Sequence, residues 1–213
     1  AIHVLRLAPG DAVALFDGHG REWSGHVAEV GRRDVQVAAE ELRRAPRPGP
    51  ALVLGQAWLH RDKTIEAIIK QGTALGATQF RFFRGDHSER GPRPNPKWER
   101  WAVEACKQCG RLWLPGFDIT ENIEATLEAS SASVLLATTE LEPVALGDAV
   151  AGGDTLVLVG PEGDFSQKER RAALAGGARP ISLGEATLRS ELAAVVALTL
   201  VGYHLGLRGT APS

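Results

Sequence analysis

The sequence predicts an α/β protein that begins with a small antiparallel β unit. Short strands divided by turn residues precede residue 40, and strands alternate with helices after residue 50. Of the 213 residues, 44% are hydrophobic and 23% are charged, so the chain can bury a core and does not have the composition of a disordered protein. The longest apolar run, Leu192 to Leu200, is too short to cross a bilayer.

The first forty residues have the pattern of a β-hairpin series. Three runs have strand character and are separated by turns at Asp17-Gly18 and Gly31; they are 13–16, 22–30 and 35–39. Residues 41–50 contain three arginines, three prolines and a glycine, which is typical of a linker. We therefore predict a β domain over residues 1–47 and an α/β domain over residues 48–213.

The second domain shows strand and helix patterns in turn. Strands are predicted at 51–55, 80–83, 134–138 and 156–159. Helices are predicted over 62–75, after Asn95 as N-cap, after Ser166, and after Ser190 as N-cap. The first helix presents Ile65, Ile68, Ile69 and Leu75 on one face, with Gly72 as a mild defect. The run 156–159 is apolar throughout, which indicates a strand buried on both faces of a parallel sheet.

Charge is divided unevenly along the chain. Residues 1–111 hold 18 Lys and Arg against 13 Asp and Glu, whereas residues 112–213 hold 6 against 13. Such asymmetry suggests that the first part meets a polyanion, and the prevalence of arginine suits bidentate contact with phosphate. The alternative is a biased composition on a solvated surface.

The densest motif is the glycine-rich turn Gly160-Pro161-Glu162-Gly163 that follows the apolar strand. Ser166 and Glu169 have capping-box spacing, so a helix is predicted to begin just after the turn. Exposed backbone N–H groups and the helix dipole make such a turn a site for an anion or the edge of a nucleotide. The motif matches neither the dinucleotide-binding fingerprint nor the Walker P-loop, and an ordinary strand-to-helix turn is the alternative.

A second strand, turn and helix follow over 180–205, with Leu188-Arg189-Ser190-Glu191 at the start of the helix. Ser190 is predicted to cap this helix, and Glu191 lies in its first turn, where a carboxylate is favoured. Arg189 then lies directly before the N-terminus of the helix. It either serves a functional site or forms a structural ion pair with Glu191.

Taken in order, these motifs resemble the RsmE-type 16S ribosomal RNA uracil-N3 methyltransferases of the SPOUT class. The segments that carry the resemblance are Gly160 to Gly163, Ser182 to Gly184, Leu188 to Glu191, Leu54 to Gln56, Ser88 to Arg90 and Gln108 to Arg111. Val4 to Leu7 and Leu15 to Gly18 resemble the PUA-like N-terminal domain of that family. The resemblance extends over nearly the whole chain.

The resemblance implies a SPOUT-type domain threaded as a trefoil knot, which periodicity alone would not predict. It implies S-adenosyl-L-methionine as cofactor, 16S rRNA in the small ribosomal subunit as partner, a cytoplasmic homodimer, and neither a metal nor a membrane. The cofactor-binding residues that it implies are Leu158, Gly160, Gly163, Leu183, Gly184 and Leu188. The catalytic residues that it implies are Arg189, which would stabilise the uracil anion, with Glu191 or Glu162 orienting it or accepting a proton.

The predicted RNA-binding residues are all arginines: Arg6, Arg32, Arg33, Arg81, Arg84, Arg90 and Arg100. Those between residues 81 and 100 are interleaved with Phe80, Phe82, Phe83 and Trp98, a composition typical of an RNA-facing strip. Phe165 is the candidate aromatic platform for an unstacked base. His60 and His87 lie near the basic loops and could touch RNA, although isolated histidines are usually ordinary polar residues.

Two departures from the family pattern bear on activity. Asp164 stands where relatives usually carry glycine, which matters if that position needs a positive φ. Leu192 stands where relatives usually carry a threonine, which removes a hydroxyl near the expected site of methyl transfer. A catalytically silent RNA-binding or ribosome-assembly factor of the same fold is therefore the second hypothesis.

Two further features concern the cysteines and the start of the chain. Cys106 and Cys109 form a Cys-x-x-Cys pattern on a predicted helix, but a zinc site needs two more ligands, so we interpret both as small buried helix residues. The sequence contains no methionine, so we expect that some N-terminal sequence precedes residue 1.

Overall fold

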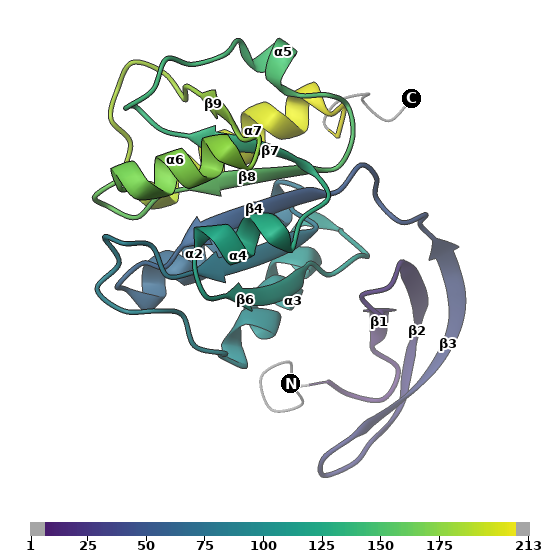
Figure 1. Cartoon of the computed structure of the whole chain (residues 1–213). Helices are drawn as coiled ribbons and strands as arrows, with labels where there is room; N and C mark the ends of the chain where they lie inside the picture. Colours follow the sequence, from purple (N-terminus) through teal and green to yellow (C-terminus); the bar gives the residue numbers. More distant parts are fainter. Residues whose placement is uncertain (1–6, 208–213) are drawn as a thin grey trace. The chain divides into compact units, whose positions relative to one another are not determined.

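The computed structural model describes residues 7–207. Contacts between Cα atoms divide the chain into two units, and Figure 1 labels most of their helices and strands. The smaller unit contains residues up to 47 together with 110–114, and the larger contains 48–109 and the chain from 115 onward.

The smaller unit contains a three-stranded antiparallel sheet in the order β1-β2-β3. Its strands are β1 (Ala12–Phe16), β2 (Arg21–Val30) and β3 (Val35–Arg44). The third strand is longer than predicted, because Arg44 still pairs with Arg21 across the ladder. The first part of the predicted linker is therefore strand.

A segment distant in sequence completes this smaller unit. Trp113 forms an isolated bridge with His19, and its indole Nε1–H donates to the carbonyl of Ala45 at 3.2 Å. The backbone N–H of Gly20 donates to the carbonyl of Leu112 at 3.0 Å. A Cβ on Gly20 would lie 2.7 Å from the Trp113 ring, so the close approach requires glycine there. Residues 110–114 thus belong structurally with strands that lie far earlier in the chain.

The larger unit contains a six-stranded, entirely parallel sheet in the order β6-β5-β4-β8-β7-β9. Its strands are β4 (Leu52–Ala57), β5 (Gln79–Phe83), β6 (Gly116–Thr120), β7 (Ser133–Ala137), β8 (Thr155–Val159) and β9 (Arg179–Ile181). Its helices are α2 (Asp62–Ala74), α3 (Lys97–Cys109), α4 (Ile123–Glu128), α5 (Leu146–Ala149), α6 (Gln167–Ala175) and α7 (Ser190–His204).

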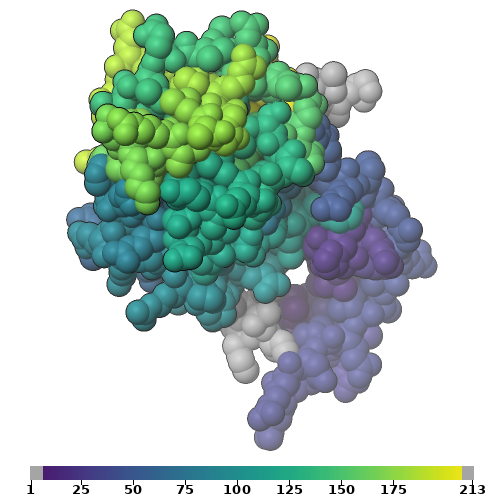
Figure 2. Space-filling view, viewed as in Figure 1, coloured from purple at the N-terminus to yellow at the C-terminus, as the bar shows by residue number. Residues whose placement is uncertain are grey.

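Helices cover both faces of this sheet. Helix α2 packs against α3 and α7, and α7 lies on β4 and β8, while α4 packs against α6 (Figure 1). In Figure 2 the residues drawn in teal to green, from about 115 to 175, lie together on the face that is shown. Strand β8 is buried over all its residues, as predicted for a central parallel strand.

Gly72 permits close packing of α2 on the sheet. A Cβ at this position would lie 2.7 Å from the ring of Phe80, and Leu198 of α7 lies nearby. The residue that the pattern marks as a defect is thus a point where the helix approaches the strand too closely for a Cβ. Ile65, Ile68 and Ile69 are buried as predicted, whereas Leu75 is only half-buried.

The structure contains elements that the pattern did not predict, and it revises one cap. Strand β6 and helices α4 and α5 were not predicted, although Asn122 caps α4 by accepting from the N–H of Ala125 at 2.9 Å. The predicted capping box of Ser166 and Glu169 is confirmed. Ser190 does not cap α7; Arg189 holds the N-cap position without a side-chain cap. Strand order alone does not decide how the chain is threaded, so the trefoil knot stays a prediction.

Within residues 7–207, every helix is too short or too polar to cross a bilayer.

Candidate active site

One pocket of the larger unit lies where three neighbouring parallel strands end, and we call it the strand-end pocket. It is formed by the segments that follow β7, β8 and β9, and it has a volume of about 580 Å³ including its open mouth. The neighbouring pair β4 and β8 is where the strand order reverses direction, and ligands in open α/β sheets bind beside such a switch point. The fold therefore places an open hollow at the expected edge of the sheet.

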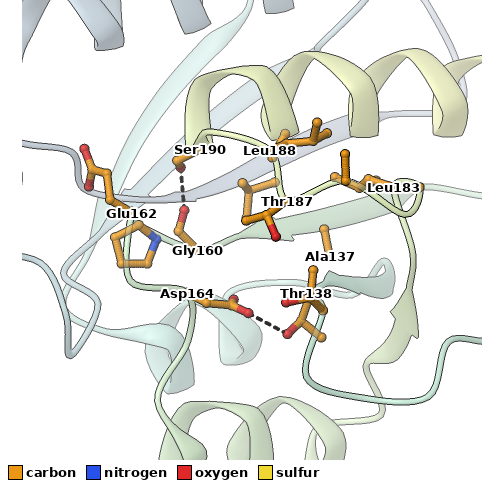
Figure 3. Close-up of a pocket in the computed structure, with 15 residues that line it drawn as sticks. Ala137, Thr138, Gly160, Glu162, Asp164, Leu183, Thr187, Leu188 and Ser190 are labelled. Carbon is orange, nitrogen blue, oxygen red and sulfur yellow. Dashed lines mark hydrogen bonds between the residues drawn. The ribbon is translucent and has the colours of Figure 1, made fainter.

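Buried hydrogen bonds hold the glycine turn, residues 160–163, in place. Gln56, on β4 and fully buried, donates from Nε2 to the carbonyl of Gly160 at 3.3 Å and to Oγ of Ser190 at 3.0 Å. The hydroxyl of Ser190 in turn donates to the same Gly160 carbonyl at 2.5 Å (Figure 3). This contact explains why Ser190 does not cap its own helix. Three segments, β4, the glycine turn and the start of α7, are thereby held together.

Asp164 adopts the left-handed conformation, with φ of 55°. Its Oδ1 accepts from the backbone N–H of Phe165 at 2.7 Å, and its Oδ2 accepts from the hydroxyl of Thr138 at 2.9 Å (Figure 3). Aspartate tolerates this region because its short side chain can bond to the local backbone. Position 164 thus needs a positive φ, which is the case in which an aspartate in place of glycine matters. The Asp164 carboxylate also links the turn after β8 to the segment after β7.

The strand-end pocket combines an apolar lining with a few polar groups. Leu183, Leu188 and Ala137 supply apolar surface, while Thr138 and Asp164 supply hydroxyl and carboxylate groups. In Figure 3 the side chains of Leu183 and Leu188 stand on the side of the pocket opposite Asp164. Such a lining suits a ligand with a flat apolar part and a positive charge.

A second, more polar cleft adjoins this pocket, because Glu162 lines both. The cleft lies at the carboxyl ends of β4 and β5. Its residues are Trp58, His60, Arg61, Thr64, His87, Ser88, Glu89, Glu162, Arg189 and Glu191. Arg189 is exposed, and within residues 7–207 it forms no ion pair with Glu191 or any other carboxylate. The structural ion-pair alternative is therefore wrong for this chain.

Comparison with known proteins now places this geometry in a family. The family model described as an RNA methyltransferase domain matches residues 47–202. The chain belongs to this family. A second model, described as an RNA methyltransferase PUA domain, matches residues 1–40 of the methyltransferase. These two family matches confirm the resemblance to RsmE-type enzymes and the predicted fold class.

Curated relatives of this methyltransferase match it over nearly its whole length. The ribosomal RNA small subunit methyltransferase E of Synechocystis is 29% identical over 95% of this chain and 69% of its own length. The protein of the same name from Mycobacterium bovis is 29% identical over 95% of this chain and 82% of its own length.

Solved structures agree in fold. A probable rRNA methyltransferase from Porphyromonas gingivalis is 27% identical, with a TM-score of 0.86 over 97% of this chain and 90% of that one. A putative methyltransferase from Legionella pneumophila, solved with the bound cofactor SAM, is 24% identical, with a TM-score of 0.85 over 95% of this chain and 86% of that one.

Most of the methyltransferase's predicted site residues gather at the two hollows. Gly160, Leu183, Gly184 and Leu188 line the strand-end pocket, and Arg189, Glu191 and Glu162 line the cleft. Two of the predicted cofactor residues lie elsewhere. Leu158 is fully buried in the sheet core, where its Cδ2 would lie 2.6 Å from a Cβ on Gly55, and its neighbour Val159 lines the pocket instead. Gly163 is outside the lining, and a Cβ there would point at His87, 3.2 Å from its Cβ.

The predicted RNA-facing strip is interrupted. Arg81 is buried, donates to the Thr126 carbonyl at 3.1 Å and pairs with Asp118 at 3.3 Å, so its guanidinium is not available to RNA. The interleaved aromatic residues are also buried; they are Phe80, Phe82, Phe83 and Trp98. The ring of Phe82 packs against those of Phe80 and Trp98. The composition therefore reflects a buried strand and helix, not an RNA-facing surface.

The remaining predicted arginines differ in position. The exposed ones among the described residues are Arg32, Arg33, Arg84, Arg90 and Arg100. Arg90 also donates to the carbonyl of His60 at 3.0 Å. Arg6 lies outside the described residues. The role of these arginines in RNA binding stays a prediction.

Three other expectations are revised by burial. Phe165 is only 1% exposed and belongs to the core cluster with Phe83 and Leu158, so it cannot stack on a base. Leu192 is half exposed and lines neither hollow. The hydroxyl of a threonine at this position would therefore not line either of them. Cys106 is buried as predicted, but Cys109 is exposed. The described residues contain no group of three or more metal-ligating side chains.

Sequence reasoning missed two residues that line the strand-end pocket, Thr138 and Thr187. It considered His87, which lines the cleft, only as a residue that could touch RNA. Thr138 directly follows an apolar strand that neighbours β8, which is a signal for a strand-end site. The position of His87 beside the glycine turn depends on a loop 76 residues away in sequence, and no local pattern indicates it.

Proposed function

We propose that this protein transfers a methyl group from S-adenosyl-L-methionine to N3 of a uracil in 16S rRNA of the small ribosomal subunit. The observation that carries the proposal is the shared wall of the two hollows. Glu162 lines both the strand-end pocket and the cleft that contains Arg189 and Glu191. A cofactor in the first would lie next to a base in the second. The names of the curated relatives support this function over a silent assembly factor.

The residues of the strand-end pocket fit S-adenosylmethionine. Leu183 and Leu188 would contact the adenine ring, and the backbone at Gly160 and Gly184 would approach the ligand closely. Asp164 places a carboxylate in the lining, which complements a cationic ligand. When bound, this cofactor supplies a methyl group on a positively charged sulfur. The similar structure from Legionella pneumophila, which was solved with bound SAM, supports the assignment.

The chemistry needs an anion to be stabilised beside the cofactor. Uracil N3 must lose its proton before it can attack a methyl carbon, and the negative charge spreads onto the ring carbonyl oxygens. The unpaired guanidinium of Arg189 would donate hydrogen bonds to one of these oxygens. Glu191 and Glu162 line the same cleft but form no ion pair with that guanidinium among the described residues, so their role in orienting it stays a prediction. Positioning and electrostatic stabilisation would supply most of the catalysis.

The test of this function is methyl transfer itself. Purified protein, tritiated S-adenosylmethionine and small subunits from a strain that lacks the modification should give label in 16S rRNA, recovered as 3-methyluridine. Naked rRNA should be labelled much less, because the intact subunit presents the base in its folded context. Cofactor binding without transfer to any rRNA substrate would instead support the silent factor.

Gly184→Ala is expected to weaken cofactor binding. Gly184 has φ of +123°, which residues with a side chain rarely adopt, so alanine would strain the 183–188 segment by roughly 1–3 kcal/mol or displace it. The dissociation constant for S-adenosylmethionine should rise about tenfold or more in calorimetry. Gly152→Ala is the matched control, because Gly152 also has a positive φ of 78° and open space but lines neither hollow. Equal effects of the two variants would remove the 183–188 segment from the site.

Arg32 and Arg33 are proposed to contact RNA phosphates from the turn between β2 and β3. Both are exposed and form no ion pair with any described residue. Replacing each with alanine should lower the salt dependence of RNA binding by about 0.7 in the logarithmic slope for each phosphate that is no longer neutralised. Arg44→Ala is the control, since Arg44 already pairs with Glu41 at 3.4 Å. If the slope falls equally in all variants, the change reflects only the lower net positive charge of the protein and not a contact made by Arg32 or Arg33.

The homodimer and the cytoplasmic location implied by the family resemblance stay predictions. Light scattering on the purified chain, with and without cofactor, measures the first.

A further inference from the structure

The ring of His87 is fixed by two backbone carbonyls. Its Nδ1 lies 2.9 Å from the carbonyl oxygen of Gly163 and 2.9 Å from that of Asp164. A carbonyl oxygen can only accept a hydrogen bond, so Nδ1 must carry a hydrogen and donate it. In the neutral ring the other nitrogen, Nε2, then holds the lone pair. The glycine turn therefore selects one tautomer of His87.

The Nε2 atom is available to a ligand. No group within residues 7–207 forms a hydrogen bond with it. The imidazole is exposed and lines the cleft, together with Arg189 and Glu162. A proton acceptor of defined tautomer thus stands in the same hollow as the proposed stabiliser of the uracil anion.

We propose that Nε2 of His87 accepts the proton from N3 of the target uracil. The assignment rests on the proposed function and names the base in that reaction. The N3–H bond breaks, the proton moves to Nε2, and the electron pair stays on N3. N3 then forms a bond to the sulfonium methyl carbon while the carbon–sulfur bond breaks and its electron pair remains on sulfur. The imidazolium afterwards releases its proton to solvent, which restores the neutral ring.

The surroundings of His87 make its imidazole a stronger base. The carbonyl of Asp164 makes the largest contribution and raises the pKa of the imidazole above its ordinary value, while burial opposes this effect in part. The carbonyl of Gly163 and the charges of Glu169 and Asp86 raise this pKa further. The other charged or titratable groups around the cleft are His60 and Arg61 after β4, Glu89 and Arg90 on the loop of His87, Glu162 after β8, and Arg189 and Glu191 at the start of α7.

The sign of the pH dependence follows. Below the raised pKa of His87 the ring already carries both protons and cannot accept another. Above it Nε2 is free, so the methylation rate should increase with pH through this pKa and level off above it.

His87→Asn separates the two nitrogens. The amide Nδ2 of asparagine is two bonds from Cβ, as Nδ1 of histidine is, so the variant keeps a donor for both carbonyls and lacks Nε2. The single-turnover methylation rate on small subunits should fall about 100-fold at pH 7, which is the lower range for loss of a general base. Cofactor affinity by calorimetry and the melting temperature should stay at the parent values. The plateau at high pH should disappear, and added imidazole should restore part of the rate.

The control is His204→Asn, which removes an exposed imidazole at the far end of α7 and should leave the rate and the pH profile unchanged. A His87→Asn protein with the parent's rate and plateau would overturn the assignment while leaving the methyltransferase function intact. A loss of cofactor affinity in parallel with rate would show instead that His87 only supports the glycine turn. A parent protein that transfers no methyl group would overturn both proposals.

Discussion

Arg189→Ala is expected to lower the methylation rate about 100- to 1000-fold, a barrier increase of roughly 2.7–4 kcal/mol. That is the range for removing one preorganised donor to a developing anion. Arg189 is exposed and has no ion-pair partner among residues 7–207, so its loss should leave the free energy of unfolding nearly unchanged. Single-turnover rates at saturating cofactor, with urea unfolding of the same samples, measure both quantities.

Two further variants sharpen this result. Arg189→Lys keeps the positive charge but loses the planar fork, so it should recover only part of the rate. Arg171→Ala removes one exposed charge on α6 that lines neither hollow, and it should retain the parent rate. If Arg189→Ala turns over at the parent rate, the anion is stabilised by another group. If it mainly lowers the melting temperature, Arg189 has a structural role.

Phe165→Ala is expected to destabilise the fold by about 3–5 kcal/mol, the usual range for truncating a buried phenylalanine. Its side chain is 1% exposed and packs in the core cluster with Phe83, Leu136 and Leu158. Phe165→Leu keeps most of the apolar volume and should cost less than about 1.5 kcal/mol. The midpoint and slope of urea unfolding measure both values.

This experiment also decides between two roles for an aromatic residue beside the glycine turn. A platform for an unstacked base would be exposed, and its removal would weaken RNA binding without changing stability. The burial of Phe165 predicts the opposite result, in which its removal lowers the free energy of unfolding and does not act through a lost contact with RNA. A stable Phe165→Ala protein that has lost only RNA affinity would contradict the core assignment.

Much of the fold follows from local pattern, because the elements concerned have strong internal signals. The apolar run of β8, the isoleucine face of α2 and the capping box of Ser166 and Glu169 are each specified by residues within a few positions of one another. Strand β6 was missed because its residues are only half-buried and include Asp118, and it forms only by pairing with β5. Pairing of that kind is not visible in a short window of sequence.

The site was predictable to the extent that it uses backbone and strand ends. The glycine turn and the 183–188 segment line the pocket where the motifs place them. Residues whose roles depend on long-range contacts were misjudged. Ser190 has the residue type of a helix cap, but its hydroxyl donates to Gly160 from 30 residues away. Arg81 has the residue type of an RNA contact, but its strand lies between β6 and β4 in the sheet and its charge is paired with Asp118.

The segment 110–114 makes the smaller unit discontinuous, and this affects when that unit can form during synthesis. Its strands are complete once residue 44 has been translated, but the bridge from His19 to Trp113 and the bond from Trp113 to Ala45 need residues made much later. Domains usually fold as units in order from the N-terminus as the chain emerges. Here the first unit must wait for α3 to leave the ribosome before its last segment arrives. A cut after residue 47 would consequently separate Trp113 from its partners, so neither fragment would carry an intact copy of the smaller unit.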